Sequence, residues 1–246
     1  MIEMNQIFSG DCLEVMKPID DSSIDMILCD LPYGITEAGH DVPLPLVYLW
    51  SSYKRIMKPM GVVVLTASQP FTSILLLSNV EMFKHEWIWL KNRGSNFANT
   101  VREPMKEHES VLVFANKKWT YNRQMQERTG GGLERSKYLV EHNSQVREGT
   151  RQFEGRPHHE ISKLRVPSSW QKFNVEVGLH PTQKPVLLFE YLIKTYSNPG
   201  DLILDNCIGS GTTAVAALNT GRNFIGIEKD LKYVEVARKR ISEAKR

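Results

Sequence analysis

The stretch Ile27–Gly34, ILCDLPYG, combines residue types that could bind a planar amine. An apolar run leads to Asp30, and Pro32 biases the residue before it towards an extended backbone. The Leu31 carbonyl and the Asp30 carboxylate can therefore point the same way, beside the flat ring of Tyr33. Two acceptors and an aromatic surface suit a nucleobase that carries an exocyclic amino group. A plain turn after a strand is the alternative.

A second stretch, Leu204–Ala214 (LDNCIGSGTTA), has the composition of a ligand-binding turn between a strand and a helix. Gly209 and Gly211 would let the backbone approach a ligand closely. Thr212 and Thr213 can cap the N-terminus of the helix that follows. A tight turn without a ligand would have the same glycines.

The next acid along the chain indicates a nucleotide ligand at this turn. Glu228 ends the following apolar run, 17 residues after Gly211. Nucleotide-binding βαβ units keep the acid that binds a ribose at about this place. The glycine spacing also fits a nicotinamide- or flavin-dependent enzyme, but such enzymes usually open with this unit, which here follows most of the chain. S-adenosylmethionine, which has an adenosine and no pyrophosphate, is the other ligand that fits.

Motifs in this order resemble the DNA methyltransferases that modify exocyclic amino groups. Asp30-Leu31-Pro32-Tyr33 matches their Asp/Asn/Ser-x-Pro-aromatic motif, and residues 204–213 resemble their cofactor loop. Residues 180–185 (HPTQKP) are similar to the segment before their cofactor half, and residues 10–16 (GDCLEVM) to the segment that contacts the cofactor's adenine. The catalytic motif precedes the cofactor motif, which is the permuted order of the beta group. The resemblance spans about 1–116 and 180–246.

The resemblance implies a fold, a cofactor and a set of site residues. The fold would be a doubly wound α/β, Rossmann-like methyltransferase fold with circularly permuted motif order, and the cofactor S-adenosyl-L-methionine. The implied catalytic residues are Asp30, Leu31, Pro32 and Tyr33. The implied cofactor-binding residues are Asp11, Cys12, Asp30, Lys184, Asp205, Asn206, Gly209, Gly211, Thr212, Thr213 and Glu228. Among them, Asp11 would contact the cofactor's adenine and Lys184 its methionine carboxylate.

The substrate implied is adenine in double-stranded DNA, because Asp30 in place of serine resembles the adenine-modifying members. Cytosine methylated on its exocyclic amine is the first alternative. A nicotinamide-dependent oxidoreductase is the second, although no Ser/Tyr/Lys or His/Asp set for hydride transfer appears. Asn206 and Cys207 stand where many members have Pro-Phe, so a catalytically inactive DNA-binding relative is the third.

Six apolar segments are predicted to form the buried strands that position these motifs. They are Asp25–Asp30, Val62–Thr66, Trp87–Leu90, Ser110–Ala115, Asp201–Asp205 and Asn223–Glu228. A helical pattern that begins near Pro185 places Leu187, Leu188, Tyr191 and Leu192 on one face. The alternation of strands and helices predicts a mostly parallel sheet.

The middle of the chain is basic. Residues 117–172 contain twelve Lys and Arg against six Glu, a net charge of +6, whereas the whole chain carries +3. Clustered basic charge is typical of surfaces that bind nucleic acid, although a solvated basic face would look the same. We therefore predict a catalytic half at 1–116, a DNA target-recognition region at 117–179 and a cofactor-binding half at 180–246. The His158-His159 pair lacks partner ligands, and we predict no metal site.

Length and composition fit one globular domain with an insertion, since 41% of the 246 residues are hydrophobic and 24% are charged. No apolar run approaches the roughly 20 residues of a membrane span, so we expect no membrane association. The odd number of cysteines (Cys12, Cys29 and Cys207) argues against a disulfide framework and predicts a reduced, cytoplasmic setting. Dimerisation is common among similar enzymes, which makes a homodimer a further expectation.

Overall fold

The structure, a computed structural model, describes residues 2–34, 43–128, 163–176, 178 and 183–244. The chain divides into two units, one formed by Met1–Asn122 with Ser169–Arg246 and the other by Arg123–Ser168. The smaller unit falls within the predicted recognition region, 117–179. In its described part, the short strands β6 (Gln126–Glu127) and β7 (Leu164–Arg165) pair antiparallel. The His158-His159 pair lies outside the described residues.

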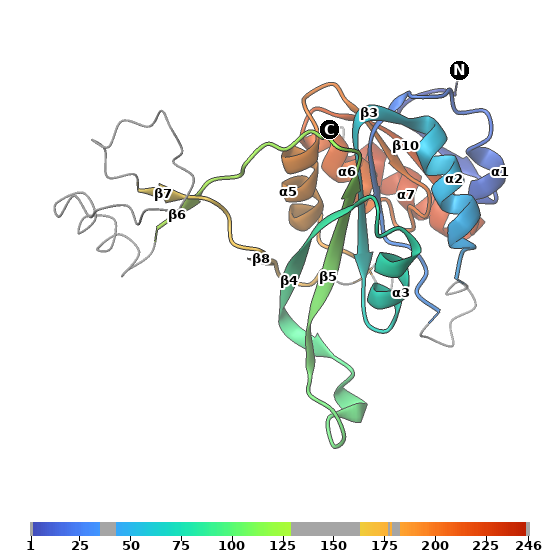
Figure 1. The fold of residues 1–246 in the computed structure, drawn as a ribbon. Coiled ribbons are helices and arrows are strands. Elements are labelled where there is room, and N and C mark those ends of the chain that lie inside the picture. Colours follow the sequence, from blue (N-terminus) through green and yellow to red (C-terminus); the bar gives the residue numbers. More distant parts are fainter. Residues whose placement is uncertain (1, 35–42, 129–162, 177, 179–182, 245–246) are drawn as a thin grey trace, which may run out of the picture. The chain divides into compact units, whose positions relative to one another are not determined.

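The larger unit is built around a sheet that has eight strands in the described part of the chain (Figure 1). The strands are β1 (Gln6–Ser9), β2 (Ile24–Cys29), β3 (Met57–Ala67), β4 (Phe83–Ser95), β5 (Lys106–Ala115), β8 (Trp170–Lys172), β9 (Leu202–Asp205) and β10 (Asn223–Glu228). Their order across the sheet is β1-β10-β9-β2-β3-β5-β4-β8. Among these strands only β5 runs antiparallel to its neighbours. The prediction of a mostly parallel sheet is therefore confirmed.

Helices cover both faces of this sheet (Figure 1). They are α1 (Cys12–Val15), α2 (Leu46–Ile56), α3 (Phe71–Ser78), α5 (Val186–Tyr196), α6 (Thr212–Asn219) and α7 (Leu231–Ala244). Successive side chains of a strand point to opposite faces, so Met26 and Leu28 pack with α5, α6 and α7, whereas Ile27 and Cys29 pack with α1, α2 and α3. Burial on both faces explains why the central strands are continuous apolar runs. None of the helices in the described ranges combines the length and apolarity needed to cross a bilayer.

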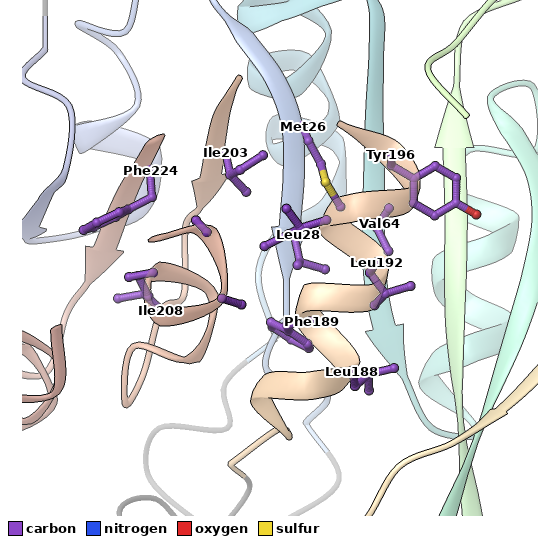
Figure 2. Close-up of a cluster of buried hydrophobic side chains, with 14 of the residues drawn as sticks. Met26, Leu28, Val64, Leu188, Phe189, Leu192, Tyr196, Ile203, Ile208 and Phe224 are labelled. Atoms are coloured by element: carbon purple, nitrogen blue, oxygen red, sulfur yellow. The ribbon is translucent and has the colours of Figure 1, made fainter. Parts of the chain in front are cut away.

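Helix α5 packs against the middle of the sheet (Figure 2). Its buried side chains include Leu188, Phe189, Leu192 and Tyr196, which lie over Met26, Leu28 and Val64 of the strands. The prediction that Leu187 belongs to this face is wrong, because its side chain is 63% exposed. The buried face is centred one position further along the helix than the sequence pattern suggested.

Strands β4 and β5 are longer than predicted and form a hairpin. β4 continues past the predicted Trp87–Leu90 segment to Ser95. β5 begins at Lys106, before the predicted Ser110–Ala115 segment. Asn96 adopts the left-handed conformation at the turn, and its side-chain Oδ1 accepts a hydrogen bond from the Lys106 amide at 2.8 Å. The tip exposes Phe97 and Val101, and the stem forms part of the wall of the cleft described next.

Candidate active site

A cleft of about 1190 Å³ opens at the carboxyl ends of the parallel strands. Met26 of β2 is in register with Ile203 of β9, so both strands end at the same edge of the sheet. The Asp30–Tyr33 motif follows β2, and the glycine turn follows β9. Every residue that the sequence predicted for the site lines this cleft except Gly211. The two motifs, far apart in the sequence, therefore meet in one site.

Both oxygens of the Asp30 carboxylate accept hydrogen bonds. Oδ1 accepts from the Tyr33 hydroxyl at 2.7 Å and from the Thr66 hydroxyl. Oδ2 accepts from Lys184 Nζ at 2.6 Å. The register of β2 with β3, in which Cys29 pairs with Leu65, places Thr66 opposite Asp30. The carboxylate is thus held in one orientation in the lining of the cleft.

Lys184 lies between two carboxylates. Its Nζ forms ion pairs with Asp30 at 2.6 Å and with Glu109 Oε2 at 3.5 Å, and only 6% of its side chain is exposed. Burial by itself lowers the pKa of Lys184, but the charges of Asp30 and Glu109 outweigh it and raise the pKa above its usual value. Lys184 is therefore a buried ammonium ion at the place where the two motifs meet.

The Tyr33 ring forms a wall of the cleft beside Asp30. It stacks on Phe71 of α3, with ring centroids 5.2 Å apart and planes inclined by 23°. Lys184 Nζ lies 5.6 Å from its centroid. Burial, followed by the nearby charges of Asp30 and Glu109, raises the pKa of the Tyr33 hydroxyl, which consequently stays protonated and donates to Asp30.

The glycine turn brings the last two strands together. Gly209 and Gly211 both have positive φ, of 50° and 85°. Glu228, at the end of β10, accepts a hydrogen bond from the Gly209 amide at 2.9 Å through Oε2. A Cβ added to Gly209 would contact nothing within 4 Å among the described residues, whereas one added to Gly211 would meet Ala237 of α7. Gly209 thus borders open space in the cleft, and Gly211 allows α7 to approach the turn.

Asp205 is buried beneath this turn. Its carboxylate accepts from the Cys207 amide at 3.0 Å and from the Thr213 hydroxyl. Burial raises the pKa of Asp205 to about 7, even though these two hydrogen bonds lower it. The side chain consequently stabilises the turn by binding residues at both of its ends.

Asn206 and Cys207, where the resemblance implied Pro-Phe in many members, have their own partners. Asn206 Oδ1 accepts a hydrogen bond of 2.5 Å from the Tyr53 hydroxyl of α2. The thiol of Cys207 interacts with those of Cys12 and Cys29, and burial raises the pKa of Cys29 to about 12. All three thiols are free, so the cysteines of the chain gather in reduced form beside the cleft.

Four partners of the site were not predicted: Tyr53, Thr66, Lys91 and Glu109. Thr66 could have been found, since it ends a predicted strand next to the strand that leads to Asp30. Glu109 reaches the site through the antiparallel pairing of β5 with β4, where it lies opposite Trp89. Lys91 then binds Glu109 Oε1 at 2.5 Å. No local pattern marks this pairing.

Asp11 and Lys184 have other contacts in this structure than the resemblance implied. Asp11 caps α1, where its Oδ1 accepts from the Leu13 amide at 2.9 Å, and it still lines the cleft. Lys184 is directed at Asp30. Their predicted roles towards the cofactor stay predictions.

Comparison with known proteins identifies the family. A family model described as a DNA methylase, N6_N4_Mtase, matches residues 24–239. The chain belongs to this family. The predictions of an amino-methylating DNA methylase and of a doubly wound methyltransferase fold are therefore confirmed.

Individual relatives of this DNA methylase match along almost the whole chain. The type II methyltransferase M1.MboII of Moraxella bovis is 29% identical, and the alignment covers 96% of both chains. The DNA adenine methyltransferase YhdJ of Escherichia coli (strain K12) is 28% identical over 98% of this chain and 84% of its own length. The crystal structure of an M1.HpyAVI-SAM complex is similar with a TM-score of 0.65 and 27% identity, covering 96% of this chain and 98% of that one.

Proposed function

We propose that this DNA methylase transfers a methyl group from S-adenosyl-L-methionine to the exocyclic amino group of adenine in double-stranded DNA. The observation that carries the proposal is the single cleft in which Asp30, Leu31 and Tyr33 lie with the Gly209 turn. The family match supports S-adenosyl-L-methionine as the cofactor. It also argues against a nicotinamide-dependent oxidoreductase.

The cleft fits this cofactor. Gly209 leaves open space where a side chain would intrude, and the acids Asp11 and Glu228 lie around it. Acids in these places suit the amino group of an adenine and the hydroxyls of a ribose. S-adenosyl-L-methionine supplies a methyl group on a positively charged sulfur, which makes that methyl electrophilic.

The residues of the chain act on the base. The amino nitrogen of adenine is a poor nucleophile, because its lone pair is delocalised into the ring. In the proposed mechanism Asp30 and the Leu31 carbonyl accept its two hydrogens and favour a tetrahedral nitrogen whose lone pair faces the methyl donor. Asp30 takes the proton as the new bond forms. Alignment of two bound reactants can supply about 7–11 kcal/mol of the rate enhancement.

A base in a duplex has to leave the helix to reach Asp30, at a cost of a few kcal/mol. Stacking on an aromatic ring such as Tyr33 is worth about 1–3 kcal/mol per base. The basic residues between 117 and 172 are proposed to bind phosphates, so DNA affinity should fall with salt. Adenine is favoured over cytosine by the Asp30 motif and by the likeness to a relative named as an adenine methyltransferase.

The experiment is incubation of duplex DNA with S-adenosyl-L-methionine labelled with tritium on its methyl group, followed by nucleoside analysis. We expect N6-methyldeoxyadenosine as the labelled deoxynucleoside and no label with Asp30→Ala. Label in N4-methyldeoxycytidine would show that the target base is cytosine, and the proposed mechanism would still apply to its exocyclic amine. No label in any base would favour the inactive DNA-binding relative. The homodimer stays a prediction, which the mass of the protein in solution would test.

A further inference from the structure

An amino group of this protein occupies the place that the substrate amine needs. Lys184 Nζ lies 2.6 Å from Asp30 Oδ2 and 5.6 Å from the centre of the Tyr33 ring. A target adenine would bring its own amino group to the same carboxylate, next to the same ring. Asp30 Oδ1 is already engaged by Tyr33 and Thr66. The incoming base therefore competes with Lys184 for Oδ2.

A second carboxylate oxygen lies within reach of the displaced ammonium. Glu109 Oε2 is 3.5 Å from Lys184 Nζ, is buried, and has no hydrogen-bond partner in the part of the chain that the structure describes. A buried charged oxygen without a hydrogen bond is costly. A small movement of Lys184 would satisfy it.

Glu109 is held in place to receive this contact. Its other oxygen, Oε1, binds Lys91 Nζ at 2.5 Å, and Lys91 in turn lies 5.1 Å from the centre of the Trp89 ring. Trp89 is buried and pairs with Glu109 across β4 and β5. The Glu109 carboxylate is thus anchored at one end while the other end faces Lys184.

We propose that Lys184 moves from Asp30 to Glu109 when the target base binds, which makes Glu109 a positioning residue for recognition of the amino group. This inference rests on the proposed function. Without Glu109, the displaced ammonium would lose the carboxylate oxygen that lies 3.5 Å from its Nζ, and loss of one partner of a buried ion pair is strongly unfavourable. The raised pKa of Lys184 agrees, because a lysine that stays charged needs a second anion when it leaves the first.

The test compares duplexes that differ only in the target base, which is either adenine or purine, the analogue without the amino group. The target position is first mapped from DNA methylated by the wild-type protein. Dissociation constants for both duplexes are measured with S-adenosylhomocysteine present, and the preference is the purine value divided by the adenine value. Differences in base pairing between the duplexes cancel when variants are compared.

We expect Glu109→Gln to reduce this preference by about 10- to 100-fold, as for the loss of a charged hydrogen bond. The affinity for S-adenosylhomocysteine alone should change by less than about threefold, because Lys184 stays on Asp30 until a base binds and no charged hydrogen bond is lost. The matched control is Glu86→Gln, which neutralises an exposed glutamate on β4 that does not line the cleft. Its preference should equal that of the wild type.

A second variant separates an effect through Lys184 from a general one. In Lys184→Met no ammonium has to be moved, so adding Glu109→Gln should leave the preference of that variant unchanged. Lys194→Met, an exposed lysine of α5, controls for the loss of a positive charge. Far-UV circular dichroism of each variant establishes that it is folded.

Three results would overturn the inference. The preference could be the same in Glu109→Gln as in the wild type, or it could fall equally with and without Lys184. Alternatively, Glu109→Gln could weaken cofactor binding as much as base binding, which would assign Lys184 to the cofactor carboxylate. Failure of the proposed function looks different, since the wild-type protein would then methylate no DNA.

Discussion

Replacing Gly211 by alanine is expected to destabilise the fold, because α7 leaves no room for a methyl group. Gly211 has a φ of 85°, and an added Cβ would lie 3.0 Å from Ala237 Cβ and 3.2 Å from Ala237 Cα. The left-handed backbone costs a non-glycine residue about 1–2 kcal/mol. Overpacking against a helix backbone adds about 1–3 kcal/mol. The free energy of unfolding should therefore fall by about 2–5 kcal/mol.

Gly209→Ala is the matched control. Its φ of 50° carries a similar backbone cost, but the added Cβ meets no described atom within 4 Å. The difference between the two variants, about 1–3 kcal/mol, therefore measures the contact with α7. For a domain of this size, each kcal/mol shifts Tm by about 2–4 °C.

Both variants would be unfolded with urea, without cofactor, and followed by far-UV circular dichroism. Gly211→Ala should unfold at the lower urea concentration. Gly209→Ala should be the one that weakens cofactor binding in titration calorimetry, since its methyl group enters the cleft. Equal stability of the two variants would refute the argument from the position of α7.

Three further outcomes are expected. Asp30→Asn should abolish methyl transfer while cofactor binding measured by calorimetry survives; full activity would remove Asp30 from the mechanism. Tyr33→Ala should slow turnover more than Tyr33→Phe, which keeps the ring; equal rates would show that stacking is not its role. Burial raises the pKa of Asp205 from 3.8 to about 7, so its contribution to stability is lost as pH rises from about 4 to 7. Asp205→Asn should flatten that part of the urea-stability profile, and an unchanged slope would contradict the assignment.

The central strands could be predicted because their environment is simple. β2, β9 and β10 are covered by helices on both faces, so most of their residues are apolar and the runs stand out. β1 was missed, because Gln6–Ser9 is a short edge strand in which only Ile7 is buried. The length of β4 was missed as well, since the polar residues of its hairpin stem carry no apolar signal.

The site was predictable where its residues sit in local motifs. The Asp30 and Gly209 segments each have the pattern of a strand followed by a turn, and parallel strands bring such turns to the same edge of the sheet. Lys184 was predicted to lie in this site, but its contact with Asp30 was not. That contact and the position of Glu109 depend on side-chain packing and on the register of an antiparallel hairpin, which no short stretch of sequence encodes.

The pairing of β1 with β10 and of β2 with β9 has a consequence during synthesis. β1 and β2 emerge early from the ribosome. Their partners β10 and β9 emerge only after the hairpin and the basic segment have been translated. Until then β2 presents an unpaired apolar edge, which in an unfinished chain is prone to aggregate. The cofactor site is also incomplete until β10 is made, because Asp11 and Glu228 both line the cleft. Nascent chains should therefore neither bind the methyl donor nor methylate DNA. Chaperones that shield strand edges should raise the yield of folded enzyme.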